Sequence, residues 1–108
     1  MHRNDDNMLA RLLEELSDDY YAPWEVADIW LYYTGKKFDE NVVQCVLELM
    51  KEGKIDAYVM NDGIFDTVAA KEALKYLSNR SSWLYDTDMS RRVVYLSTSQ
   101  SGLEWIQR

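Results

Sequence analysis

Apolar residues recur at helical spacing in three consecutive segments before residue 53, whereas alternating, strand-like runs occur only after it. The helical segments are residues 5–16, 23–33 and 39–52, and in each of them apolar side chains three or four positions apart form a stripe. Such a stripe is stable only when it packs against another element. The first half of the chain is therefore expected to be three helices packed against one another.

The second half of the chain alternates between short strands and short helices. The expected elements are a strand over 55–60, a turn at 61–63, a return strand at 64–65, a helix with Thr67 as its N-cap, a strand over 92–96 and a final helix with Ser99 as its N-cap. With 108 residues, 47% of them hydrophobic, the chain has material for one core but not for two. We predict a single α+β domain over residues 1–108, with three N-terminal helices, a small antiparallel β-hairpin or sheet with an inserted helix, and a short C-terminal helix.

Three helices followed by two strands that can pair is the layout of a winged helix, and three segments carry a resemblance to that family. Residues 49–55, Leu-Met-Lys-Glu-Gly-Lys-Ile, resemble the junction between its third helix and first wing strand. Residues 95–105 resemble its closing strand, followed by a hydroxyl cap and a glycine-containing helix, and residues 18–26 are similar to a segment of small bacterial proteins of about this length. The resemblance implies a winged-helix-like domain of bacterial type, whose relatives look like transcription regulators or like accessory and toxin-immunity proteins.

The negative charge is concentrated at the start of the chain. Residues 1–35 carry eight acidic and two basic side chains, whereas the whole chain has a net charge of -7. Six aromatic residues occupy the fourteen positions from 20 to 33, more than one helix face can bury. Acidic and aromatic side chains together are typical of a surface that steers and anchors a basic protein partner. The alternative is a solvated acidic surface that maintains solubility, with Trp24, Trp30 and Tyr33 as ordinary core residues.

The function predicted from this pattern is a non-enzymatic protein-interaction module, of the bacterial immunity or adaptor type, that binds a basic partner through residues 18–33. The residues predicted to bind that partner are Asp18, Asp19, Tyr20, Tyr21, Trp24, Glu25 and Asp28. A third interpretation is a homodimer, in which the aromatic residues of the second helix meet their own copies.

A winged helix that binds DNA is the alternative function. Its candidate contacts are Lys36, Lys37, Asn41, Gln44, Arg91 and Arg92. Against it, the segment 39–52 that would enter the groove carries four acidic side chains and only Lys51 as a cation. Binding to a polyanion depends on cations facing the phosphates, so nucleic acid is the less favoured partner.

Signals for catalysis, metals and membranes are weak. His2 is the only histidine, no glycine-rich phosphate loop occurs, and the pair Asp86 and Asp88 lacks the further ligands of a calcium loop. Cys45 lies among apolar residues of the third helix and is expected to be an inert core thiol. A single cysteine and the lack of an apolar run of about 20 residues favour a cytoplasmic protein without a membrane segment. We expect no enzyme activity, no cofactor and no metal.

Overall fold

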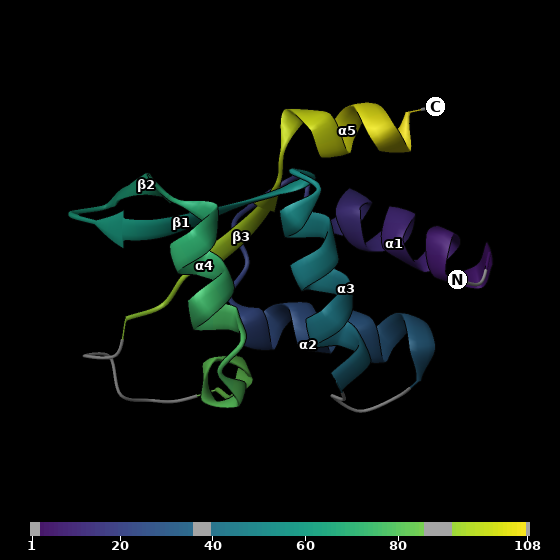
Figure 1. Ribbon diagram of the computed structural model, residues 1–108, viewed down its shortest axis with the longest axis horizontal. Coiled ribbons are helices and arrows are strands. Elements are labelled where there is room, and N and C mark those ends of the chain that lie inside the picture. The colour runs from purple at the N-terminus through teal and green to yellow at the C-terminus, as the bar shows by residue number, and fades with distance from the viewer. Residues whose placement is uncertain (1–2, 36–39, 86–91, 108) are drawn as a thin grey trace.

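Three helices precede a small antiparallel sheet, and further helices are attached around it (Figure 1). The computed structural model describes residues 3–35, 40–85 and 92–107. The elements are α1 (Arg3–Glu15), α2 (Pro23–Thr34), α3 (Glu40–Lys51), β1 (Ile55–Asn61), β2 (Ile64–Val68), α4 (Ala70–Leu77), the 3-10 helix η1 (Arg80–Trp83), β3 (Tyr95–Thr98) and α5 (Gln100–Ile106). The predicted α+β class is confirmed.

Helix α2 begins and ends where the sequence predicts. Pro23 lies in its first turn, and the Glu25 carboxylate accepts the backbone N–H of Ala22 at 2.8 Å, so one donor at the helix start is satisfied. At the other end Gly35 takes a positive φ of 70°, and its N–H bonds to the Leu31 carbonyl at 2.8 Å. Glycine adopts this left-handed conformation without a steric penalty, which stops the helix there.

The sheet has the strand order β2-β1-β3, and every pair is antiparallel. The two-residue turn between β1 and β2 consists of Asp62 and Gly63, both with positive φ, as a tight β-hairpin requires. At the other edge, Tyr21 forms an isolated bridge with Leu96 of β3, so the loop between α1 and α2 extends the sheet. The third strand therefore lies between β1 and this loop.

Two sequence-based boundaries are wrong, and both errors lie in the sheet. Thr67 is not a helix N-cap but a β2 residue opposite Tyr58, and α4 begins at Ala70 with Ala69 as its cap. The last strand covers Tyr95–Thr98 rather than 92–96, because its partners are residues 55–58 of β1. In both places pairing with a distant strand prevails over the local preference.

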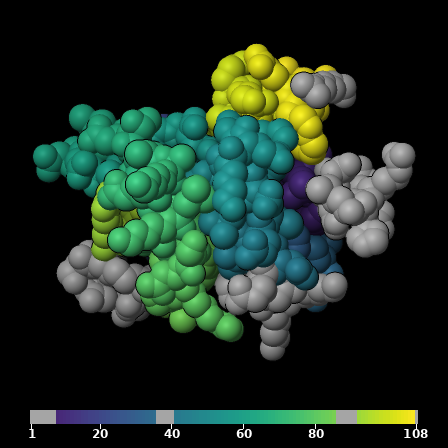
Figure 2. Space-filling view, viewed as in Figure 1, coloured from purple at the N-terminus to yellow at the C-terminus, as the bar shows by residue number. Residues whose placement is uncertain are grey.

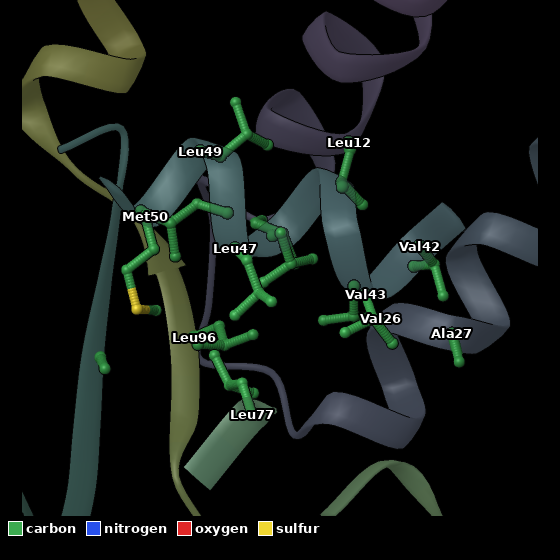
Figure 3. Close-up of a cluster of buried hydrophobic side chains, with 14 of the residues drawn as sticks. Leu12, Val26, Ala27, Val42, Val43, Leu47, Leu49, Met50, Leu77 and Leu96 are labelled. Atoms are coloured by element: carbon green, nitrogen blue, oxygen red, sulfur yellow. The ribbon is translucent and has the colours of Figure 1, made fainter. Parts of the chain in front are cut away.

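The core lies where α1, α2 and α3 meet one face of the sheet (Figure 3). Its fully buried members include Leu12 of α1, Val26 of α2, Val46 of α3, Leu77 of α4 and Leu96 of β3. Figure 2 shows α3 and α4 side by side on one side of the molecule, with α5 along its top. The three predicted helical stripes thus converge on one core.

Helix α5 is fixed to the start of β1 by its first turn. Ser99 Oγ accepts the N–H of Gly102 at 3.1 Å and donates to the Gly53 carbonyl at 2.5 Å, which confirms Ser99 as the N-cap. The Lys54 ammonium lies 4.8 Å from the ring centre of Trp105, a cation–π contact. Both ends of α5 are thereby held to residues that join α3 to β1.

Candidate interaction surface

The loop between α1 and α2 is held firmly against β3. Tyr21 and Leu96 exchange two backbone hydrogen bonds of 2.9 and 2.8 Å, and the Tyr21 hydroxyl donates to Asp18 Oδ1 at 2.7 Å. The neighbouring carboxylate of Asp19 accepts the backbone N–H of Tyr20 at 2.7 Å. These bonds fix two exposed carboxylates in place on a segment that has no helix or strand of its own.

The Tyr21 hydroxyl lies close to several carboxylates. The hydrogen bond to Asp18 raises the pKa of Tyr21 to about 12, with smaller contributions from burial and from the charges of Asp18, Asp19 and Glu15. The charges of Glu15 at the end of α1 and of Asp18 and Asp19 in the loop after it therefore all favour the neutral form of this phenol.

A recess of about 430 Å³ opens between α1 and α2. The residues that line it are Glu15, Asp28, Ile29, Tyr32 and Tyr33. The Tyr33 hydroxyl donates to Glu15 Oε1 at 2.5 Å, which raises the pKa of Tyr33, and the rings of Tyr32 and Tyr33 meet edge to face at 5.0 Å and 87°. Glu15 thus connects the recess with the carboxylates around Tyr21. We call Glu15, Asp18, Asp19, Asp28, Tyr32 and Tyr33 the acidic surface.

An aromatic cluster covers the face of the sheet that points away from the core. Tyr20 stacks on Phe65 of β2, with ring centres 3.9 Å apart and planes 12° apart, and meets Tyr58 of β1 edge to face at 4.9 Å. Phe65 also meets Tyr95 of β3 edge to face at 5.3 Å. Burial is the main cause of the raised pKa of Tyr58, followed by the charge of Asp56. Tyr20, which the sequence places in the acidic segment, therefore belongs to the sheet surface.

Two residues of the predicted binding segment, Trp24 and Glu25, make contacts within the fold. The Glu25 carboxylate caps α2 through Ala22, so its charge is partly used within the fold. Trp24 is half-buried and lies edge to face with Tyr85 at 5.8 Å. Of the predicted binding residues, the structure places Asp18 and Asp19 in the loop before α2 and Asp28 in the recess, and it leaves the others in supporting positions or on the sheet face.

The predicted binding segment, residues 18–33, did not include Glu15 or the aromatic partners of Tyr20, and Tyr32 and Tyr33 lay within it but were not singled out. Their signal is present in part: Tyr58 alternates with buried Ala57 along β1, which places it on the outer face. The pairing of Tyr33 with Glu15 has no local signal, because the two residues are eighteen positions apart and on different helices.

Three of the six residues proposed to contact DNA, Asn41, Gln44 and Arg92, lie in the described part of the chain, and only Arg92 of these is a cation. Asn41 and Gln44 are exposed on one face of α3, but Glu48 is exposed on the same face. Arg92 forms an ion pair of 2.7 Å with Glu72 of α4. Lys36, Lys37 and Arg91 lie outside the described residues.

Within residues 3–35, 40–85 and 92–107 there is no group of three side chains placed to hold a metal ion. His2, Asp86 and Asp88 lie outside those ranges. The apolar neighbours of Cys45 in sequence suggested that it is fully enclosed in the core. In the structure it is half-buried and packs against the edge of the core. None of the helices in the described part of the chain has the length and apolar character that crossing a lipid bilayer requires.

Similarity to other proteins was sought at three levels. Comparison with protein-family models, with curated proteins and with solved structures found no match to this chain.

Proposed function

We propose that this chain is a non-enzymatic protein-interaction module, of an adaptor or immunity type, that binds a basic polypeptide through the acidic surface. One observation carries the proposal: three of the four carboxylates of this surface are held by neutral donors. Asp18 accepts from the Tyr21 hydroxyl, Glu15 from the Tyr33 hydroxyl, and Asp19 from a backbone N–H. A neutral donor fixes a carboxylate in place without cancelling its charge.

Two carboxylates elsewhere in the described part of the chain are paired with cations. Glu52 is paired with Lys54 at 2.5 Å, and Glu72 with Arg92 at 2.7 Å. Residues 8–35, by contrast, contain six acidic side chains and only Arg11 as a cation. A fixed, unneutralised negative surface attracts a basic partner over a distance of about a Debye length, ~8 Å at physiological salt. The tyrosines beside it supply the rigid aromatic contacts that protein interfaces favour.

We further propose that the scaffold is winged-helix-like, with β1 and β3 as the two wing strands. Supporting this interpretation, β1 and β3 pair antiparallel after three helices, and the loop between α1 and α2 bridges to β3 at Tyr21. In this interpretation β2, α4 and η1 are an insertion between the wing strands. Helix α3 would then be the element that enters a DNA groove in other members, and its exposed Glu48 opposes that use.

The test compares two pairs of charge reversals that alter the net charge equally. Asp19→Lys with Asp28→Lys changes the acidic surface, and Glu48→Lys with Glu104→Lys changes exposed positions on α3 and α5. Glu25 is left unchanged because it caps α2. Each variant is immobilised, and proteins captured from an extract of the producing cells are quantified by mass spectrometry.

The proposal expects a basic protein that wild type and the Glu48/Glu104 variant capture equally, and that the Asp19/Asp28 variant captures about tenfold less. Equal loss in both variants would indicate a general charge effect and contradict the proposal. Undiminished capture by the Asp19/Asp28 variant would place the binding surface elsewhere.

DNA binding is the second candidate, and the exposure of Asn41 and Gln44 on one face of α3 favours it. A mobility-shift assay with genomic fragments at low and moderate salt separates the two functions. The proposal expects no shift that survives moderate salt. A sequence-dependent shift that Gln44→Ala abolishes would instead support a regulator that uses α3.

A further inference from the structure

The recess between α1 and α2 has walls of two chemical kinds. One kind is aromatic: the rings of Tyr32 and Tyr33 stand at 87° to each other and form a corner. The other kind is anionic, with the carboxylates of Glu15 and Asp28. Ile29 completes the lining. A site with π faces on one side and carboxylates on the other matches an organic cation, because both kinds of wall attract positive charge.

The size of the recess limits what it can hold. Its volume of about 430 Å³ lies toward the lower end of the range of roughly 300–1,000 Å³ that small-ligand sites occupy. A single side chain with its charged end fits such a volume, whereas a helix or a strand does not. Tyr32 is 81% exposed, so the recess is accessible from solvent.

The carboxylates are available to a ligand. Glu15 accepts the Tyr33 hydroxyl through Oε1, which leaves its second oxygen without a donor among the described residues. Asp28 has neither a hydrogen-bond donor nor a cation among those same residues, and its side chain is exposed. Two carboxylates on one recess favour a donor that can reach both at once.

The chain itself shows which cation suits these rings. The guanidinium carbon of Arg11 lies 5.4 Å from the ring centre of Tyr33, so a guanidinium already occupies one side of this tyrosine. The charge of Arg11 opposes a second cation, but Glu15 and Asp28 outnumber it. A guanidinium is planar, carries five N–H donors and stacks on aromatic rings, whereas an ammonium is a compact and strongly hydrated charge.

We propose that this recess is a socket for the guanidinium of an arginine side chain, presented by the basic partner; the inference rests on the proposed function and specifies its anchor. The arginine stacks in the corner of Tyr32 and Tyr33 and donates to Glu15 and Asp28. The acidic surface around Tyr21 then faces the cations that flank that arginine in the partner.

The test uses N-acetyl-arginine methylamide as the probe and follows the amide and tyrosine-ring resonances of the full chain by NMR. The neutral isostere N-acetyl-citrulline methylamide and the lysine analogue are titrated in parallel. We expect saturable shifts at the α1–α2 recess with the arginine probe, at millimolar affinity. Binding should be about tenfold weaker with the lysine probe, and absent with citrulline.

Two variants that leave the fold intact locate the site. Asp28→Asn and Tyr32→Ala alter exposed side chains, and each should weaken binding about fivefold or more, while Glu48→Gln, a matched change on α3, should leave it unchanged. Equal binding of citrulline or lysine, or undiminished binding by Asp28→Asn, would overturn the socket. If the probe does not bind while capture of a basic protein still depends on Asp19 and Asp28, the socket is wrong and the proposed function stands. If the probe binds but capture does not depend on them, the proposed function is wrong.

Discussion

Replacing Gly102 with alanine tests how closely α5 approaches the start of β1. A Cβ at position 102 would lie 2.3 Å from the Lys54 carbonyl oxygen and 2.7 Å from Thr98 Cγ2. Neither neighbour can move freely. The Lys54 carbonyl accepts the N–H of Ser99 at 2.9 Å, and the Thr98 hydroxyl donates to the Leu13 carbonyl at 2.6 Å.

Two effects of opposite sign determine the result. Overpacking a buried position costs about 1–3 kcal/mol, and the upper end applies here because the Lys54 carbonyl and the Thr98 side chain are both held. Alanine favours a helix over glycine by about 1 kcal/mol, which offsets part of that cost. We therefore expect Gly102→Ala to lower the free energy of unfolding by about 2 kcal/mol and the melting temperature by about 8 °C.

Urea unfolding followed by tryptophan fluorescence measures this difference. Ser101→Ala is the matched control, because Ser101 is an exposed residue in the same turn, and it should change stability by less than about 0.5 kcal/mol. If Gly102→Ala is as stable as the wild type, the close approach of α5 to Lys54 is refuted. If both variants lose the same amount, the loss comes from the helix turn and not from packing.

Two further changes test the links that hold the loop and η1. Folding raises the pKa of Tyr21 from 10.0 to about 12, so the native state favours its protonated form; the stabilisation is complete below pH 10 and is lost as the pH rises through 12. Unfolding should therefore show Tyr21→Phe about 1 kcal/mol less stable than the wild type at pH 8, the shift being reduced by solvent screening. At pH 11.5, where the stabilisation is already declining, the difference should be clearly smaller. A constant difference would contradict the role of Asp18. Trp83 is 2% exposed and its Nε1 donates to the Leu77 carbonyl at 2.8 Å, so Trp83→Phe should lower the free energy of unfolding by about 2 kcal/mol. Trp105→Phe, the same change at a half-buried tryptophan, should lower the free energy of unfolding by less than about 1 kcal/mol. If thermal unfolding shows the two variants destabilised equally, the burial of Trp83 does not determine its contribution.

The helices could be predicted because their signals are local. Pro23 at the start of α2, Gly35 after its end and Ser99 before α5 each act within a few residues, and the structure places each where it was expected. The strand boundaries depend on partners that are far away in the chain. Thr67 has the side chain of a helix cap, but Tyr58 opposes it across the sheet, and nothing near Thr67 in sequence indicates that pairing.

The same distinction applies to the candidate site. The acidic residues of the loop, Asp18 and Asp19, could be predicted from the sequence because they are adjacent in the chain. The recess could not be found in this way, because it exists only when the end of α1 meets the exposed side of α2 and brings Glu15 to Tyr33. Trp24 and Glu25 were predicted as contacts because their residue types suit an interface. In the fold, Glu25 caps α2 and Trp24 packs against Tyr85, and neither contact can be read from residue type alone.

Arg11 gives the strongest reason to regard the acidic surface as more than a solvated face. It precedes Glu15 by four positions on α1, the spacing at which helical ion pairs form, yet its guanidinium lies over the ring of Tyr33 and not in an ion pair with Glu15. Glu15 instead accepts the Tyr33 hydroxyl. An ion pair would have cancelled the charge at the mouth of the recess, whereas a phenol donor fixes the carboxylate and leaves it negative. Keeping like charges fixed and unneutralised destabilises the isolated domain, and a cation supplied by a partner would relieve that repulsion.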